Sequence, residues 1–375
     1  MSSRELFLSS VSYEFRRVAR YLYELLSRIC FWNWKIKEFP IKANSFNSLL
    51  YLGRRSRETS AMMILGVWHN SVKKIVDHEH RVKRRVIVSE LPFPDAICVP
   101  NYLSHVLPID RPLDELIGNI GSDKLKFYQK NRASYRVEKI VADQEINQID
   151  QTMLRSFATH RYGEWALQLK LSKVKSIALK QGTLNVIYFN EQKVACSLGS
   201  SMSRNGKSIW RGERAGFPEN VYTHSKTFNE INTMNYFLEI EWACQHGYDF
   251  YEIGVSLARP EDNVLQWKRR LRGHLDTMGN YNYFYIRPPK ENACDFFWET
   301  PLFGLENGKI CLHLGKPDDK TDDEFIIRYR SMGFGGLSTI YIHCDRAPSQ
   351  PALTRIANLY NHFEKPPNIK IISKQ

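Results

Sequence analysis

Hydrophobic residues in the middle of the chain recur at helical spacing in some segments and alternate, as in strands, in others. Between residues 113 and 287 this pattern predicts, in order, helices over 114–119 and 122–132, a strand over 135–141, helices over 144–159 and 172–180, strands over 183–189, 193–200 and 208–213, a helix over 225–246, a strand over 248–253, a helix over 261–272 and a strand over 281–286. The long helix carries one apolar stripe and stops at Gly247. The order predicts an α/β domain in which helices pack against a mixed sheet.

The segments on either side of this region have patterns of their own. The tail follows a β-α-β-α-β order, with elements expected over 309–314, 322–332, 339–344, 351–363 and 369–372. Toward the N-terminus, apolar runs over 61–67 and 86–88 predict strands with irregular connections. We therefore expect an N-terminal helix plus α/β region (1–112), a central α/β domain (113–287) and a small C-terminal α/β module (305–375).

A basic amphipathic helix is predicted over residues 4–32. Its apolar positions recur every three or four residues, arginines lie between them, and Trp32 and Trp34 follow. Such a helix either docks on its own domain or lies on a membrane surface, so peripheral membrane contact stays open.

Composition and charge add an anionic partner to this picture. Hydrophobic residues make up 43% of the chain, which predicts a packed core, and the net charge is +13. The surplus of cations suits a nucleotide cofactor, RNA, another polyanion or a membrane surface, although it also serves solubility alone. DNA is not among the partners we expect.

The cysteines and the apolar runs bear on location. The seven cysteines are scattered without a Cys-x-x-Cys pair, which indicates reduced thiols and a cytoplasmic protein. We expect no secretory signal peptide and no transmembrane segment, because the start lacks an apolar core and no run of 18 apolar residues occurs.

One segment contains several metal-ligand residue types. Residues 77–80 read Asp-His-Glu-His, but the basic run 81–85 that follows would repel a cation, and adjacent ligands fit poorly around one ion. We therefore predict no metal site.

The segment 248–273 carries the clearest indication of function. A short strand (Tyr-Asp-Phe-Tyr-Glu-Ile) leads into a Gly/Ser turn, and a Lys/Arg-rich helix then ends at Gly273. After a long amphipathic helix, this order resembles the C-terminal part of the GNAT acyltransferase fold, in its FemA/FemB-like variant. The resemblance covers residues 113–287 and leaves room for a second, degenerate GNAT-like half in the N-terminal region.

The resemblance implies an activity and a bacterial origin. In this superfamily an amine or hydroxyl attacks an acyl donor directly. The donor implied is acetyl-CoA or another acyl-CoA, or aminoacyl-tRNA, and the acceptor is a sugar, a peptide or a small metabolite. The loop 215–226 has Gly216 alone in place of the superfamily's Gly-rich pyrophosphate loop, so either donor fits.

Candidate catalytic residues lie on two of the predicted strands. Glu252 shares a strand face with Phe250 and would be partly desolvated, which suits a general base; pairing with an arginine of 268–272 is the alternative. Glu213 ends another strand and is the second candidate base, and Tyr251 completes the catalytic set.

Candidate binding residues surround these positions. Lys268 and Arg269 look like the family's basic pair and, with Ser256, are the predicted cofactor-binding residues, unless they form a solvated face. For the acceptor we predict the residues that end a strand and a helix, Trp210, Arg211, His160 and Arg161. His160 would serve equally as a cap of its helix.

Two other functions remain open. In the first, the chain is a non-catalytic GNAT-like module whose basic and aromatic residues bind RNA or another polyanion. In the second, it is a peripheral membrane enzyme that is anchored through residues 13–34 and modifies a lipid-linked substrate.

Overall fold

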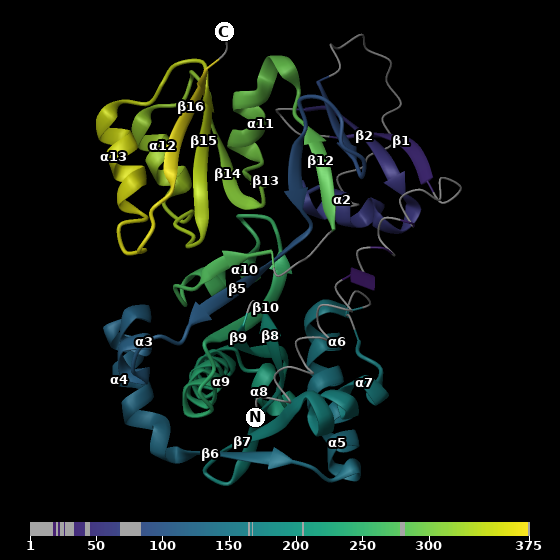
Figure 1. Cartoon of the computed structure of the whole chain (residues 1–375), viewed down its shortest axis with the longest axis vertical. Helices are drawn as coiled ribbons and strands as arrows, with labels where there is room; N and C mark the ends of the chain where they lie inside the picture. The colour runs from purple at the N-terminus through teal and green to yellow at the C-terminus, as the bar shows by residue number, and fades with distance from the viewer. Residues whose placement is uncertain are drawn as a thin grey trace. The chain divides into compact units, whose positions relative to one another are not determined.

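Helices and strands alternate through the described chain, a mixed α/β protein (Figure 1). The computed structural model describes residues 18, 19, 22, 26, 34–41, 46–67, 84–163, 166, 168–204, 206–277 and 282–373. These residues form two compact units. Unit 1 contains Val106–Gly254, which is inserted between the two parts of unit 2, Arg17–His105 and Val255–Gln375.

Unit 1 is a mixed sheet with helices on both faces. Its elements are β5 (Tyr102–Pro108), α3 (Leu113–Ile120), α4 (Ser122–Asn131), the 3₁₀ turn η4 (Arg132–Ser134), β6 (Tyr135–Ile140), α5 (Asp143–Ile149), the π-helical turn η5 (Asp150–Arg155), α6 (Ser156–Tyr162), α7 (Leu171–Ser176), the π-helical turn η7 (Ile177–Gln181), β7 (Gly182–Phe189), β8 (Gln192–Arg204), β9 (Lys207–Gly216), α8 (Glu219–Tyr222), α9 (Ser225–Gln245) and β10 (Phe250–Leu257). The sheet has seven strands in the order β11-β5-β10-β9-β8-β7-β6, where β11 (His274–Asp276) comes from a later part of the chain; the strands from β6 to β9 are antiparallel, and β10 runs parallel to β9. The order of elements predicted from 114 to 253 is therefore confirmed.

Local sequence explains two of the turns in unit 1. Asn190 (φ 48°) and Glu191 (φ 63°) both adopt positive φ, which gives the tight turn that joins β7 to β8. Gly247 (φ 67°) follows the end of α9, where glycine adopts this conformation without the steric penalty of a side chain.

The two faces of the unit 1 sheet carry different residues. Leu184, Val186 and Leu198 are buried in a core with residues of α5 to α7. Strand alternation places Asn185 and Ser197 on the opposite face, which α9 covers (Figure 1). The face toward α9 is thus the more polar one.

Unit 2 contains two sheets. The first is a five-stranded sheet with the order β1-β2-β3-β12-β4. Its strands and the helical elements between them are β1 (Trp34–Pro40), β2 (Ser48–Arg54), the 3₁₀ turn η2 (Arg55–Arg57), α2 (Glu58–Ile64), β3 (Arg85–Ser89), β4 (Ile97–Pro100) and, later in the chain, β12 (Tyr283–Arg287). Between the end of unit 1 and the second sheet, the chain also contains α10 (Asn263–Arg269), β11 (His274–Asp276), the 3₁₀ turn η8 (Lys290–Asn292) and α11 (Ala293–Glu299).

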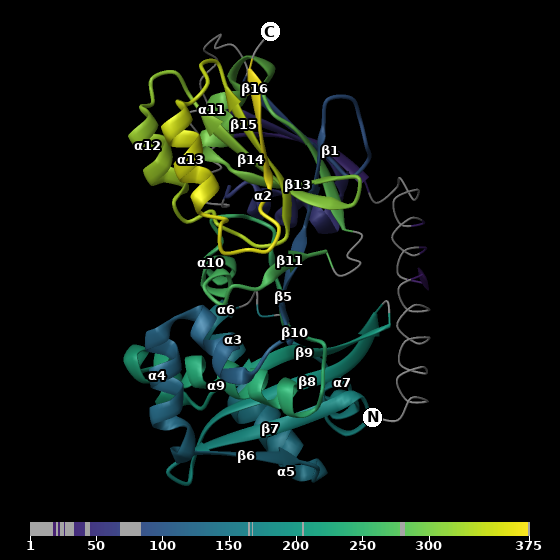
Figure 2. The same ribbon diagram turned by 60° about the vertical axis from the view of Figure 1, so that its left-hand side comes forward.

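The predicted β-α-β-α-β module is confirmed as the second sheet of unit 2. Its elements are β13 (Leu302–Glu306), β14 (Lys309–Lys316), α12 (Asp322–Tyr329), β15 (Leu337–Cys344), α13 (Gln350–Asn358) and β16 (Asn368–Ser373). β14, β15 and β16 run parallel, and β13 adds an antiparallel edge. α12 and α13 cover one face and α11 lies on the other (Figures 1 and 2). Thr321 and Glu324 cap the N-terminus of α12 with reciprocal hydrogen bonds.

Two sequence-based assignments differ from the structure. The run 61–67 is not a strand: Ala61 to Ile64 lie in α2, because an apolar run without alternation fits a buried helix as well as a strand. The predicted strand over 281–286 exists as β12, but it pairs with β3 and β4 in unit 2. The three predicted domain ranges stay a prediction.

Two other predictions fall largely on residues that are not described. The Asp-His-Glu-His segment 77–80 lies outside the described residues, as does most of the N-terminal helix. Of that helix, Val18, Leu22 and Leu26 are helical and exposed.

Candidate functional site

The two parallel strands of unit 1 part at a defined point. Phe250, Tyr251 and Glu252 of β10 pair with Ile209, Trp210 and Arg211 of β9, and both strands continue for five residues beyond the last pair. On its other edge β9 contains a bulge, because Leu198 of β8 faces Arg214 whereas Gly199 faces Gly212. Glu213 is the extra residue of this bulge. Since bulges bend a strand and increase its twist, the bulge alters the course of β9 directly after its last pair with β10.

An ion pair with a buried carboxylate lies where the pairing of β9 with β10 ends. The carboxylate of Glu252 is fully buried and accepts two hydrogen bonds from Arg211, from Nε at 2.7 Å and from Nη2 at 3.0 Å. This bidentate geometry is the strongest kind of charge-assisted pairing, and it offsets the cost of burying the carboxylate. Two residues predicted for different roles are therefore joined, and the partner of Glu252 is Arg211.

A second polar pair lies on the same face. Ser200 pairs with Arg211 across the antiparallel β8–β9 ladder, so their side chains share a face. The Ser200 hydroxyl donates to Oε1 of Glu213 at 2.6 Å. The bulge thus brings the second candidate base, Glu213, to the face that carries Arg211 and Glu252.

The opposite face holds the other predicted residues of these strands. Trp210 is buried and donates from Nε1 to Oε2 of Glu239, a residue of α9, at 2.8 Å. Tyr251 is buried too, and burial together with the nearby Glu239 raises the pKa of its phenol well above the usual value. Trp210 and Tyr251 are therefore core residues beneath α9.

The predicted acceptor-binding residues of α6 lie on the surface of unit 1. His160 is exposed, and its ring packs on Tyr222 with centroids 4.5 Å apart. Arg161 is exposed as well, with its guanidinium 5.9 Å from the ring centroid of Phe157. Both residues close α6, and their roles in acceptor binding stay a prediction.

The predicted cofactor-binding residues belong to unit 2. Lys268 is buried, with Nζ donating to the carbonyl of Val255 at 3.1 Å, so it does not lie on a solvated face. Burial lowers the pKa of Arg269, which hydrogen-bonds Gln266. Ser256 is buried, and among the described residues its hydroxyl has no hydrogen-bond partner. Their role in cofactor binding stays a prediction.

A buried histidine beside Lys268 has no sequence signal of its own. His105 lies in β5, at the end of the first part of unit 2; it is fully buried, and neither ring nitrogen has a hydrogen-bond partner within the described part of the chain. Burial and the positive charge of Lys268 lower the pKa of this histidine to about 3, so the ring is neutral.

The connection from β9 to α9 is built for packing. It contains the short helix α8, and His224 precedes α9. A Cβ atom at Gly216 would lie 2.8 Å from Sγ of Cys196 and 2.9 Å from the backbone nitrogen of Leu154. Glycine is therefore required here by the close approach of β9 to η5, which explains why Gly216 stands alone.

Glu239 and its partners are functional candidates that the sequence reasoning missed. The Glu239 side chain is buried and accepts two hydrogen bonds. The Ser197 hydroxyl donates to Oε1, and Nε1 of Trp210 donates to Oε2. Burial raises the pKa of Glu239, although the two hydrogen bonds act in the opposite direction. The signal was present in the sequence: Ile231, Asn235 and Glu239 follow at intervals of four, so two polar residues interrupt the apolar stripe of α9.

Within the described ranges, no three His, Cys, Asp or Glu side chains are placed to hold a metal ion, and Cys98, Cys196, Cys244, Cys294, Cys311 and Cys344 are free thiols. No helix in the described part of the chain is both long and apolar enough to cross a membrane.

Comparisons with known proteins identify distant structural neighbours. No protein-family model and no curated protein matches the sequence. L-PGS from Bacillus licheniformis is similar at 11% identity and a TM-score of 0.34, over 68% of this chain and 84% of that chain. FemX is similar at 11% identity and a TM-score of 0.38, over 72% and 91%. A GCN5-related N-acetyltransferase from Anabaena variabilis is similar at 10% identity and a TM-score of 0.30, over 90% and 85%.

These neighbours include both groups that the sequence resemblance named, FemX and the GCN5-related N-acetyltransferases. TM-scores of 0.30 to 0.38 describe a distant likeness.

Proposed function

We propose that the chain is an acyltransferase of the GNAT, FemA/FemB-like kind. An amine or hydroxyl of a sugar, peptide or small metabolite would attack the carbonyl carbon of an acyl-CoA or an aminoacyl-tRNA directly. The observation that carries the proposal is the bidentate pairing of Arg211 with the buried Glu252 carboxylate at the point where the pairing of β9 with β10 ends. Its support from the sequence is the order of elements around that pair.

Direct transfer needs a proton acceptor beside the nucleophile and hydrogen-bond donors for the developing oxyanion. Strands that part leave backbone N–H groups along their facing edges, and such groups are suitable donors for an oxyanion. The guanidinium of Arg211 adds a positive charge at the same place. It holds the Glu252 carboxyl group in place through two hydrogen bonds.

These groups account for each bond and proton of the proposed transfer. As the nucleophile forms its bond to the carbonyl carbon, its proton passes to Glu252 in the proposed scheme. The bond from this carbon to the thiolate sulfur of CoA, or to the ribose oxygen of tRNA, then breaks. The proton leaves with the thiol or hydroxyl. Glu213, held by Ser200 on the same face, is the alternative acceptor.

Donor binding comes first among the tests. Calorimetric titration of the full chain with CoA, acetyl-CoA and aminoacyl-tRNA, at two salt concentrations, measures which donor binds. Thioester-sensitive micromolar binding would support an acyl-CoA donor. Binding of aminoacyl-tRNA alone would support the other donor, and binding of neither would contradict the proposal.

Turnover then tests the role of Glu252. With a donor that binds, we expect Glu252→Gln to reduce the rate of transfer to a panel of amines by about 10²–10⁴-fold, because a positioned base contributes that much. The donor affinity should stay unchanged. Glu138→Gln, a change on the exposed side of β6, is the matched control. Full turnover in a folded Glu252→Gln protein would rule out this carboxylate as the base.

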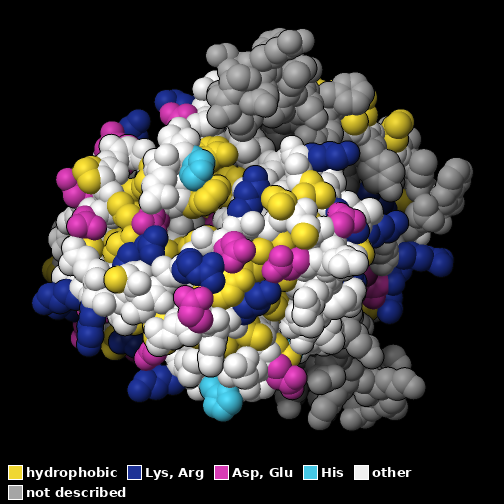
Figure 3. All heavy atoms as spheres, turned by 90° about the horizontal axis from the view of Figure 1, so that it is seen from below, with side chains coloured by type: hydrophobic (Ala, Val, Ile, Leu, Met, Phe, Trp, Pro, Cys, Tyr) yellow, Lys and Arg dark blue, Asp and Glu magenta, His cyan; other side chains and the backbone are white. Residues whose placement is uncertain are grey.

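The alternative function, a non-catalytic module that binds RNA or another polyanion, calls for a surface of one charge. On the face seen in Figure 3, Lys and Arg side chains lie among Asp and Glu side chains. That face gives the alternative no specific support. RNA binding with a steep salt dependence and no acyl transfer would favour it.

A further inference from the structure

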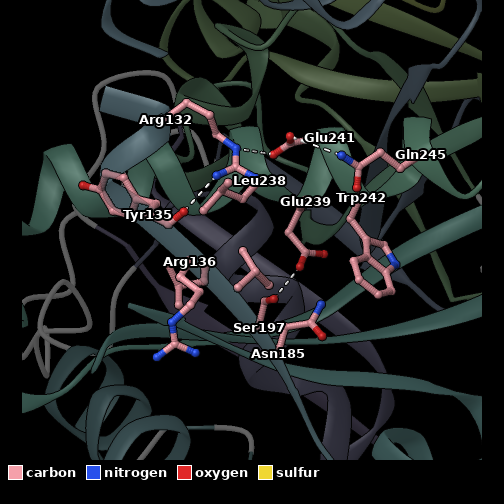
Figure 4. A pocket seen from close by; sticks show the side chains of 12 residues that line it. Arg132, Tyr135, Arg136, Asn185, Ser197, Leu238, Glu239, Glu241, Trp242 and Gln245 are labelled. Carbon is pink, nitrogen blue, oxygen red and sulfur yellow. Dashed lines mark hydrogen bonds and ion pairs between the residues drawn. The ribbon is translucent and has the colours of Figure 1, made fainter. Parts of the chain in front are cut away.

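A cavity lies on the α9 face of the unit 1 sheet, away from the Arg211–Glu252 pair. Its volume is about 340 Å³, and it is bounded by α9, Arg132 of η4 and the strands β6, β7 and β8 (Figure 4). The size is at the lower end of the range for small-molecule sites. Because Trp210 and Arg211 are consecutive in β9, their side chains point to opposite faces, and only Trp210 reaches this side.

The floor of the cavity presents hydrogen-bond acceptors. Asn185, Ser197 and Glu239 are all at most 4% exposed, and their side chains converge there (Figure 4). The Ser197 hydroxyl is used in donating to Glu239. Oδ1 of Asn185 has no hydrogen-bond partner among the described residues. A buried acceptor without a partner destabilises the fold, so a ligand that donates to it would recover this free energy.

The walls are apolar and the rim is electrically balanced. Val137, Ile187, Leu238 and Trp242 line the space above the floor. At the rim, Arg132 and Glu241 form an ion pair with 2.7 Å between Nε and Oε2. Arg136 lines the cavity too, but its guanidinium bonds Glu138 and Glu191. An anionic ligand therefore gains little from these arginines.

We propose that this cavity binds a small primary amine with an apolar body. The ammonium group would lie at the floor, where it donates to Oδ1 of Asn185 and to the carboxyl group of Glu239. Its apolar part would pack against Leu238 and Trp242. An ammonium suits the floor better than a hydroxyl, because it offers three donors and a positive charge beside a buried carboxyl group. A carboxylate ligand would bring a second carboxyl group beside Glu239. The proposal is independent of the acyl transfer proposed above.

Three probes with one carbon chain and different head groups test the proposal. Binding of n-hexylamine, 1-hexanol and hexanoate to the full chain is measured by calorimetry and by ligand-observed NMR. We expect the amine to bind at least tenfold more tightly than the alcohol, and hexanoate not to bind. Equal binding of the three probes, or binding of none, would overturn the proposal.

Two variants assign the binding to the floor. Asn185→Leu removes the unpaired acceptor at similar volume and should weaken hexylamine binding about tenfold, the equivalent of one hydrogen bond. Asn229→Leu makes the same change at an exposed position of α9 and should have no effect.

Glu239→Gln keeps the shape of the floor and removes the charge, so it should reduce the preference for amine over alcohol even if Asn185→Leu does not fold. Unchanged binding and preference in folded floor variants would place the amine elsewhere.

Discussion

Glu252 and Glu239 are both buried carboxyl groups of unit 1, yet they lie on opposite faces of the sheet and have different partners. Glu252 faces Arg211, which binds it through two nitrogen atoms. Glu239 receives hydrogen bonds from the neutral groups of Ser197 and Trp210, and burial raises its pKa. Neutral donors leave burial as the dominant influence on the pKa of Glu239. The two carboxyl groups thus differ in whether their hydrogen-bond donors carry a charge.

Removing the charged partner should give the largest effect. Arg211→Met leaves Glu252 buried without its cation, and we expect it to lower the free energy of unfolding by about 3–5 kcal/mol. Urea denaturation at pH 7 measures the change. The double variant Arg211→Met with Glu252→Leu should recover most of the loss, because no buried charge then remains. A loss below about 1 kcal/mol in the single variant would show that Glu252 does not depend on Arg211.

The pH dependence of stability should separate the two glutamates. Since the pKa of Glu239 is raised on folding, the folded state binds its proton more tightly than the unfolded state does. Glu239 therefore stabilises the fold at low pH. Its contribution falls as the pH rises from the unfolded pKa through the folded one, by at most about 1.4 kcal/mol per pH unit for one proton.

Glu239→Gln removes this dependence. Relative to the natural chain, the variant should become more stable as the pH is raised from 5 to 9. Thermal denaturation across that range, with Glu138→Gln as the exposed control, provides the measurement. Parallel pH profiles for Glu239→Gln and the natural chain would contradict the raised pKa.

The smallest expected effect concerns the bulge. Ser200→Ala removes the hydrogen bond to Glu213 and should cost about 0.5–1.5 kcal/mol, the usual net value of such a bond. Chemical denaturation compares it with Ser225→Ala, at the exposed first residue of α9. If the two variants lose equal stability, the bond to Glu213 contributes nothing specific to the Arg211–Glu252 face.

Periodicity predicted much of the fold because the segments concerned are long or sharply bounded. The helix that ends before Gly247 and the C-terminal β-α-β-α-β order were both recognisable in this way. The run 61–67 was not, since a continuous apolar run has no period that separates a helix from a strand. Pairing between distant segments, such as β12 with β3 and β4, leaves no local signal.

The site was only partly predictable for a related reason. Alternation separates Trp210 from Arg211, but it does not say which of the two faces the long helix covers. The sequence therefore placed both residues in one acceptor site, whereas the structure buries Trp210 beneath α9. Glu239 escaped notice because Leu238 and Trp242 define the same helix as an apolar one.

The insertion of unit 1 into the sequence of unit 2 also sets an order of events during synthesis. Chains emerge from the ribosome N-terminus first, so β1 to β4 appear before all of Val106–Gly254 and long before β12. In the complete sheet β12 lies between β3 and β4. One edge of each of these two strands therefore stays unpaired until β12 has been made, after unit 1. We therefore expect chaperones to bind mainly to the first hundred or so residues of the nascent chain.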